Sequence, residues 1–119
     1  MPSRNPALRF EDILENISRI ERYTSGMDIR DVAADSMRAD AIERCLARIS
    51  EAAVKLGKDA ERLCPEIPWR DIRGIGNRLR HEYTTVDLTR IMLVVEKDLT
   101  GLKDSCREAL RRIDRDRSE

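Results

Sequence analysis

Apolar side chains recur every three or four residues in four segments of the chain, which is the spacing of a helix that buries one face. The first segment follows Asn5 and Pro6, residues typical of a helix N-cap and first turn, and it ends near Thr24 and Gly26. Its apolar stripe consists of Phe10, Ile13, Leu14, Ile17 and Ile20. No segment alternates between apolar and polar residues as a half-buried strand does, so the pattern predicts an all-α protein.

A second helical region extends from Asp28 to about Gly57. Roughly thirty residues is long for a helix in a globular protein, so we expect a kink or a break near Arg38. The apolar stripe of this region consists of Val32, Met37, Ile42, Leu46, Ile49, Ala53 and Leu56. Residues 64–68 then form a loop, because Pro65 and Pro68 lack an amide hydrogen and Pro68 disfavours the α conformation in the residue before it.

The third helix begins at Pro68, and its spacing turns Trp69, Ile72, Ile75 and Leu79 inward. A fourth helix follows Asp87, a natural N-cap, and Gly101 weakens it. Its apolar stripe consists of Leu88, Ile91, Val94, Val95, Leu99 and Leu102. Short connections between four such helices predict an antiparallel four-helix bundle. Residues 1–119 form one domain, and we expect the charged segment 107–119 to fray.

The composition suits a single helical domain, since the 119 residues include 39% charged and only 3% aromatic residues. The formal net charge is zero, so any binding of nucleic acid must come from a local patch. Three cysteines without CxxC spacing, Cys45, Cys64 and Cys106, argue against a disulfide framework and a zinc site, and we expect buried thiols. With no long apolar run and no signal-peptide core, the chain is expected to be soluble and cytoplasmic, with no membrane segment.

Most of the polar chemistry lies in one stretch, from Arg73 to Tyr83. On a helix, Arg73, Asn77 and His81 are four residues apart and fall along one face, where a cation, an amide and an imidazole could grip a phosphate. His81 is the only histidine of the chain and can exchange a proton near neutral pH. The face therefore indicates a candidate site for phosphate chemistry.

Four arginines stand close together in this part of the chain, with Asp71 as the only acid among them: Arg70, Arg73, Arg78 and Arg80. Such a window can neutralise two or three phosphates of a nucleic acid, and it can equally be a solvated helix face. Trp69 suits a core anchor better than a platform for base stacking, because the bundle has few other large aromatic side chains.

Two glycines interrupt the predicted third helix, Gly74 and Gly76. Each costs about 1 kcal/mol relative to alanine in a helix interior, so we expect a compensating close approach of another backbone or of a ligand. A helix that starts late or bends at this point is the alternative.

The run from Gly74 to Tyr83, with Thr84-Thr85-Val86-Asp87 after it, resembles the signature of the HepT-like (DUF86) branch of the HEPN superfamily. The family motif reads arginine, four residues, histidine, any residue, tyrosine. His81 and Tyr83 match it, whereas Gly76 occupies the arginine position. The resemblance also includes the first amphipathic helix, the helix around residues 41–53, the Pro68-Trp69 pair and the last helix, and so covers nearly the whole chain.

The resemblance implies a homodimeric helical bundle with the motif helices close together, and a toxin that cleaves RNA without a metal ion or another cofactor. His81 would act as general acid/base and Asn77 would position the phosphate. Arg70 and Arg80 would contact the RNA substrate through its phosphates.

The resemblance also implies a partner, a minimal nucleotidyltransferase (MntA-like) antitoxin that neutralises the toxin by modifying Tyr83 with AMP. Because Gly76 replaces the motif arginine, the cation of the site would come from Arg73, from Arg78 or from a neighbouring subunit. The alternative is a non-catalytic dimeric module that partners a nucleotidyltransferase and keeps Tyr83 as the modified residue, with ribonuclease activity lost through Gly76.

Overall fold

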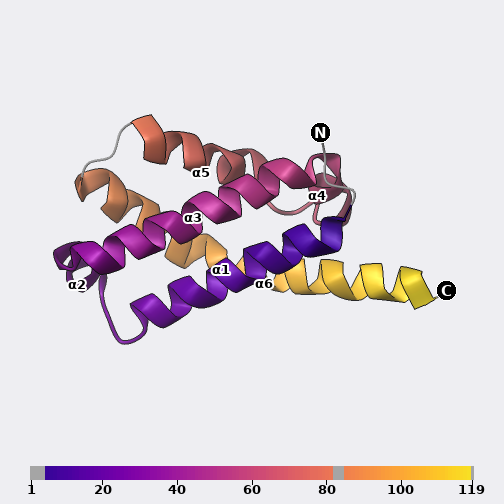
Figure 1. Ribbon diagram of the computed structural model, residues 1–119, viewed down its shortest axis with the longest axis horizontal. Coiled ribbons are helices and arrows are strands. Elements are labelled where there is room, and N and C mark those ends of the chain that lie inside the picture. Colours follow the sequence, from indigo (N-terminus) through magenta and orange to yellow (C-terminus); the bar gives the residue numbers. More distant parts are fainter. Residues whose placement is uncertain (1–4, 82–84, 119) are drawn as a thin grey trace.

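The computed structural model describes residues 5–81 and 85–118, with the side chains of residues 5–28, 30–77 and 97–117. These residues form six helices and no strand: α1 (Pro6–Thr24), α2 (Ile29–Ala34), α3 (Ser36–Leu56), α4 (Lys58–Leu63), α5 (Trp69–His81) and α6 (Thr85–Ser118). The long helices α1, α3, α5 and α6 run alternately in opposite directions, with α3 between α1 and α5 (Figure 1). The all-α bundle predicted from the sequence is confirmed, and two short helices, α2 and α4, are added to it.

Helix α1 begins and ends where the sequence predicts. The side chain of Asn5 accepts a hydrogen bond from the amide of Leu8 at 3.3 Å, and Pro6 occupies the first turn. At the other end, Gly26 follows with a φ of 72°, in the left-handed region that glycine adopts without strain.

The second helical region is broken at Asp35, three residues before the expected point at Arg38. Asp28 and Asp31 form a capping box that begins α2, and the side chain of Asp35 accepts from the amide of Arg38 at 3.1 Å to begin α3. The guanidinium of Arg38 also donates to the carbonyl of Tyr23 at 2.6 Å, which ties this break to the end of α1.

The predicted loop of residues 64–68 is confirmed, and α5 starts directly after it. The carbonyl of Pro68 accepts from the amides of Asp71 and Ile72 at 3.0 and 3.2 Å, which starts the helix. The expected start of the last helix is wrong, because α6 begins at Thr85 and already includes Asp87. Helix α6 then continues through Gly101 to Ser118, so residues 107–118 are helical rather than frayed coil.

The core lies between α1, α3, the start of α5 and the second half of α6. Trp69 is 2% exposed, its ring meets Phe10 edge to face at 6.5 Å, and its indole nitrogen donates to the carbonyl of Cys64 at 2.9 Å. The three cysteines are free and buried as predicted, and burial raises the pKa of the Cys64 thiol to about 11.

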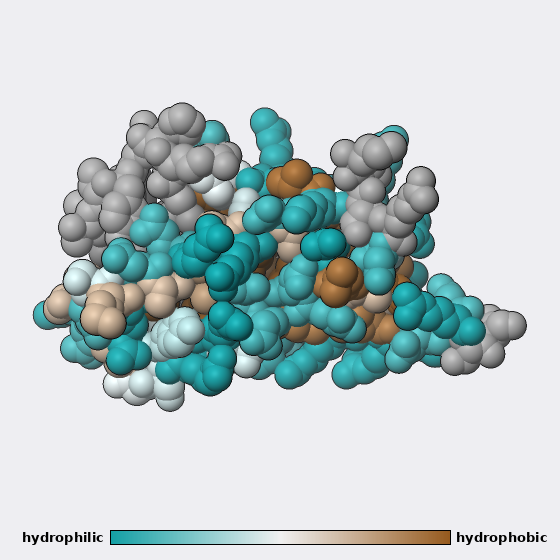
Figure 2. Space-filling view, in the orientation of Figure 1, coloured by the Kyte–Doolittle hydropathy of each residue, from teal (hydrophilic) through white to brown (hydrophobic). Residues whose placement is uncertain are grey.

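The face of the molecule shown in Figure 2 is mostly hydrophilic, and apolar side chains are visible on it only in isolated places. Among the described side chains, the large apolar ones that remain exposed are Leu8, Met37 and Val54. In the part of the chain that the structure describes, no helix has both the length and the apolarity needed to cross a membrane.

Substitutions at two glycines with contrasting backbone conformations test the described fold. Gly57, between α3 and α4, has a φ of 55° and a ψ of −137°, so Gly57→Ala is expected to lower the free energy of unfolding by about 1–3 kcal/mol. Gly101 lies inside α6, and a Cβ added there would meet no atom of the described residues within 4 Å. Gly101→Ala is therefore expected to raise the free energy of unfolding by about 0.5–1 kcal/mol. Urea unfolding of both variants measures the two values, and a loss of stability in Gly101→Ala would contradict a regular helical conformation at Gly101.

Candidate functional site

Helix α5 is fixed to the core at its start and presents polar residues further along. Trp69 and Ile72 are buried against the core, which confirms Trp69 as a core anchor, while Arg70 and Asn77 are exposed. Position 81 is the last of α5 and lies one turn after Asn77 on the same side of the helix. The exposed side of α5 therefore carries Arg70, Asn77 and position 81 in succession.

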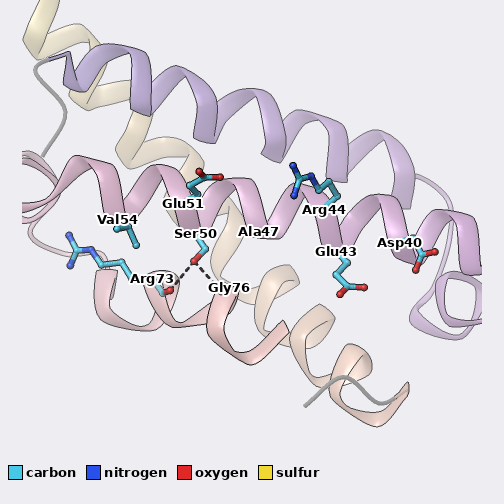
Figure 3. A pocket seen from close by; sticks show the side chains of 9 residues that line it. All are labelled: Asp40, Glu43, Arg44, Ala47, Ser50, Glu51, Val54, Arg73 and Gly76. Carbon is cyan, nitrogen blue, oxygen red and sulfur yellow. Dashed lines mark hydrogen bonds between the residues drawn. The ribbon is translucent and has the colours of Figure 1, made fainter. Parts of the chain in front are cut away.

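A single serine of α3 binds the backbone of α5 at the middle of that helix. Ser50 is 3% exposed, and its hydroxyl donates to the carbonyl of Arg73 at 2.8 Å. The same oxygen accepts from the amide of Gly76 at 3.1 Å. Both hydrogen bonds are drawn in Figure 3, where the Ser50 side chain points from α3 directly at the neighbouring turn of α5.

The close approach expected at the two glycines is present at Gly76. A Cβ added to Gly76 would lie 2.9 Å from the hydroxyl oxygen of Ser50, whereas a Cβ added to Gly74 would meet no atom of the described residues within 4 Å. The close neighbour of Gly76 is thus the side chain of Ser50 in the same chain. Helix α5 continues through both glycines, so the alternative of a late start is wrong.

Arg73 makes a second polar link between α5 and the end of α3. Its guanidinium donates to the carbonyls of Ala53 at 3.2 Å and Gly57 at 2.9 Å, which are acceptors at the C-terminus of α3. It also pairs with the carboxylate of Glu61 at 2.5 Å, and this hydrogen bond lowers the pKa of Glu61. Arg73 is therefore already engaged by protein acceptors, and its predicted role in catalysis stays a prediction.

The remaining predicted site residues are at the end of α5 and beyond it. The side chains of Arg78, Arg80 and His81 lie outside the described residues, as does the whole of Tyr83. Asn77 and Arg70 are described and exposed, so both are accessible to a ligand. Among the described side chains, no group of three His, Cys, Asp or Glu residues is placed to hold a metal ion.

An open groove of about 660 Å³ runs beside α5 along α3, and Ser50, Arg73 and Gly76 line one part of it. Farther along, the groove is lined by Asp40 and Glu43 (Figure 3). Partial burial, and then the charge of Asp40, raises the pKa of the Glu43 carboxyl. Arg44 also lines this part of the groove, so its charges are mixed.

The sequence matches a family model described as "Ribonuclease HepT-like" over residues 13–109, a range that includes all of α3 and α5. The chain belongs to the HepT-like family. A protein of Thermococcus cleftensis named "Probable ribonuclease HepT" is 37% identical to it over 93 residues, which are 78% of this chain and 84% of that protein.

More distant relatives of this HepT-like chain carry similar names. A "Putative RNase" of Methanocaldococcus jannaschii is 27% identical over 114 residues, or 96% of this chain and 94% of the relative. A "Putative RNase" of Caldanaerobacter subterraneus is 27% identical over 109 residues, or 92% of this chain and 97% of the relative. No solved structure shows significant similarity to the chain.

Sequence reasoning missed two residues that hold α5 in this HepT-like protein: Ser50 and Glu61. Ser50 carried a usable signal, because it is a small polar residue on the apolar side of α3, four residues after Leu46 and three before Ala53. Glu61 carried none, since it is one of many charged residues and its pairing with Arg73 depends on how α4 folds back.

The two described arginines of α5 are expected to differ in their contribution to stability. Arg73→Ala removes hydrogen bonds to two carbonyls and to Glu61, and we expect a loss of about 1–3 kcal/mol in the free energy of unfolding. Arg70→Ala is the matched control on the exposed side of the same helix, with an expected change within about 0.5 kcal/mol. Urea unfolding compares the two, and equal losses would show that the contacts of Arg73 do not hold α5.

Proposed function

We propose that this HepT-like protein is an endoribonuclease toxin that cleaves RNA at the C-terminal part of α5 without a metal ion. The observation that carries the proposal is the family match over residues 13–109, which contains the helix with Asn77 and His81. The exposure of Asn77 and Arg70 supports it, because a polymer such as RNA needs an open surface rather than an enclosed pocket.

In the proposed reaction the 2′-hydroxyl of RNA attacks the adjacent phosphorus, and the bond from phosphorus to the 5′-oxygen of the next nucleotide breaks. His81 accepts the proton of the 2′-hydroxyl, since an imidazole is the side chain suited to this at neutral pH. The leaving 5′-oxygen takes a proton from water. The amide of Asn77, one turn before His81, donates a hydrogen bond to a phosphate oxygen and holds the phosphate in place.

The cation that stabilises the negative charge of the phosphate in the transition state cannot come from position 76, where this chain has glycine. Because Arg73 is bound by Ala53, Gly57 and Glu61, we assign this role to Arg78 or to an arginine of a second subunit. A homodimer with the two α5 helices close together is part of the proposal, and Arg70 and Arg80 bind flanking phosphates.

The proposed partner of the toxin is a minimal nucleotidyltransferase that transfers AMP to the hydroxyl of Tyr83. Tyr83 is two residues after His81, so an attached nucleotide would add a phosphate and a base beside the catalytic histidine. The added negative charge would repel the RNA phosphate, which provides a direct physical reason for neutralisation.

Replacement of the histidine tests the proposal. Purified His81→Ala is expected to cleave RNA at least about 100-fold more slowly than the unchanged protein, because a positioned general base contributes about that much or more. The matched control is Arg107→Ala, an exposed cation of α6 outside the proposed site, which should cleave at the unchanged rate. Sedimentation of the same samples reports whether they are dimers.

Cleavage that is equal in His81→Ala and in the unchanged protein would contradict the proposed mechanism. Absence of cleavage in the unchanged protein would favour a second function, the non-catalytic dimeric partner of a nucleotidyltransferase. One observation favours that function, namely that Ser50 occupies the space beside Gly76 where a side chain would begin. Labelling of Tyr83, but not of Tyr83→Phe, by a nucleotidyltransferase and ATP would support it.

A further inference from the structure

We propose that Ser50 of α3 is a positioning residue for the site on α5, because its hydroxyl sets the rotation and the distance at which α5 meets α3. The effect on catalysis rests on the proposed function. The contact itself is observed in the structure, where the Ser50 hydroxyl donates to the carbonyl of Arg73 at 2.8 Å and accepts from the amide of Gly76 at 3.1 Å.

The burial of Ser50 makes this contact selective for one arrangement of the two helices. A hydroxyl that is only 3% exposed is costly to bury unless it is hydrogen-bonded, and both of its bonds go to backbone groups of α5. Backbone groups cannot move without the helix, so a rotation or shift of α5 breaks both bonds together. The side chain at position 50 therefore acts on the whole helix rather than on one neighbouring side chain.

Position 76 limits the approach from the other side. Glycine allows α5 to come close enough for the two hydrogen bonds, since a Cβ there would lie 2.9 Å from the Ser50 oxygen. At position 74 an added Cβ meets no atom of the described part of the chain within 4 Å. The serine and Gly76 thus form a matched pair across the two helices.

The contact lies close to the residues proposed for catalysis. Asn77 directly follows Gly76, and at about 1.5 Å of rise per residue the backbone of His81 is about 7.5 Å farther along the same helix. The helix is continuous over this distance, so a rotation at Gly76 is carried to both residues. Misplacement of reacting groups by about 1 Å can reduce a catalytic rate by about 100-fold.

The test replaces Ser50 by alanine in the full chain and follows both catalysis and His81. We expect RNA cleavage by Ser50→Ala to lose about 10- to 100-fold in kcat with little change in KM, because substrate binding by surface cations is retained. Since His81 is the only histidine, its imidazole signals in an NMR pH titration are unambiguous, and we expect them to shift in Ser50→Ala.

The control for loss of a serine hydroxyl is Ser105→Ala in α6, where the hydroxyl donates a hydrogen bond to the carboxylate of Glu66. This variant should retain kcat and the His81 titration of the unchanged protein. Equal effects of Ser105→Ala and Ser50→Ala would overturn the proposal, because they would reflect general destabilisation. An unchanged His81 titration in a folded Ser50→Ala would overturn it as well.

Gly76→Ala disturbs the same contact from α5 and keeps the proposal testable if Ser50→Ala does not fold. It should change the His81 titration, because an added Cβ would displace the Ser50 hydroxyl, while Gly74→Ala should not. If Gly74→Ala and Gly76→Ala behave alike, the proposal is wrong. Should the unchanged protein show no RNA cleavage, the proposed function fails, and the His81 titrations alone decide whether Ser50 positions the helix.

Discussion

The placement of the candidate site depends on the polar contact between α3 and α5. Among the described side chains of α5, Trp69 and Ile72 enter the core and the half-buried Ile75 packs against it. The hydroxyl of Ser50 and the guanidinium of Arg73 add polar contacts, and each joins a side chain to backbone groups of the other helix or its end. Hydrogen bonds are directional, so they define the orientation of α5 more closely than an apolar contact between two helices would.

The same contact explains the departure of this chain from the family motif. Gly76 stands where the HepT-like motif has arginine, and the structure shows the Ser50 oxygen within 2.9 Å of the place where a side chain would start. A side chain at this position would therefore displace the Ser50 hydroxyl. The loss of the arginine and the presence of the serine are physically linked, which leaves Arg78 or a second subunit as the source of a cation in the proposed reaction.

Much of the fold was predictable from local signals in the sequence. The apolar stripes identified the long helices, Asn5 and Pro6 marked the start of α1, and the two prolines of residues 64–68 marked the loop before α5. The start of α6 was missed by three residues, because Asp87 resembles an N-cap although the backbone is already helical at Thr85. The break at Asp35 was anticipated only roughly, since the region offers several residues able to cap a helix.

The sequence predicted which residues form the candidate motif, but not how their side chains are arranged in space. Helical spacing placed Arg73 and Asn77 along one face, whereas in the structure Asn77 is exposed and Arg73 is bound to the end of α3 and to Glu61. Periodicity describes a single helix, whereas these contacts depend on how α3, α4 and α5 meet. For the same reason the sequence indicated that Gly76 needs space and did not indicate that Ser50 fills it.

The most direct measurement on this account is the effect of restoring the family arginine with Gly76→Arg, assayed for both RNA cleavage and the free energy of unfolding. Because the Cβ of any side chain at position 76 must displace the Ser50 hydroxyl, we expect Gly76→Arg to be less stable than the unchanged protein and to cleave RNA more slowly. Faster cleavage with unchanged stability would contradict the account. It would show that Gly76 marks lost chemistry rather than a packing requirement between α3 and α5.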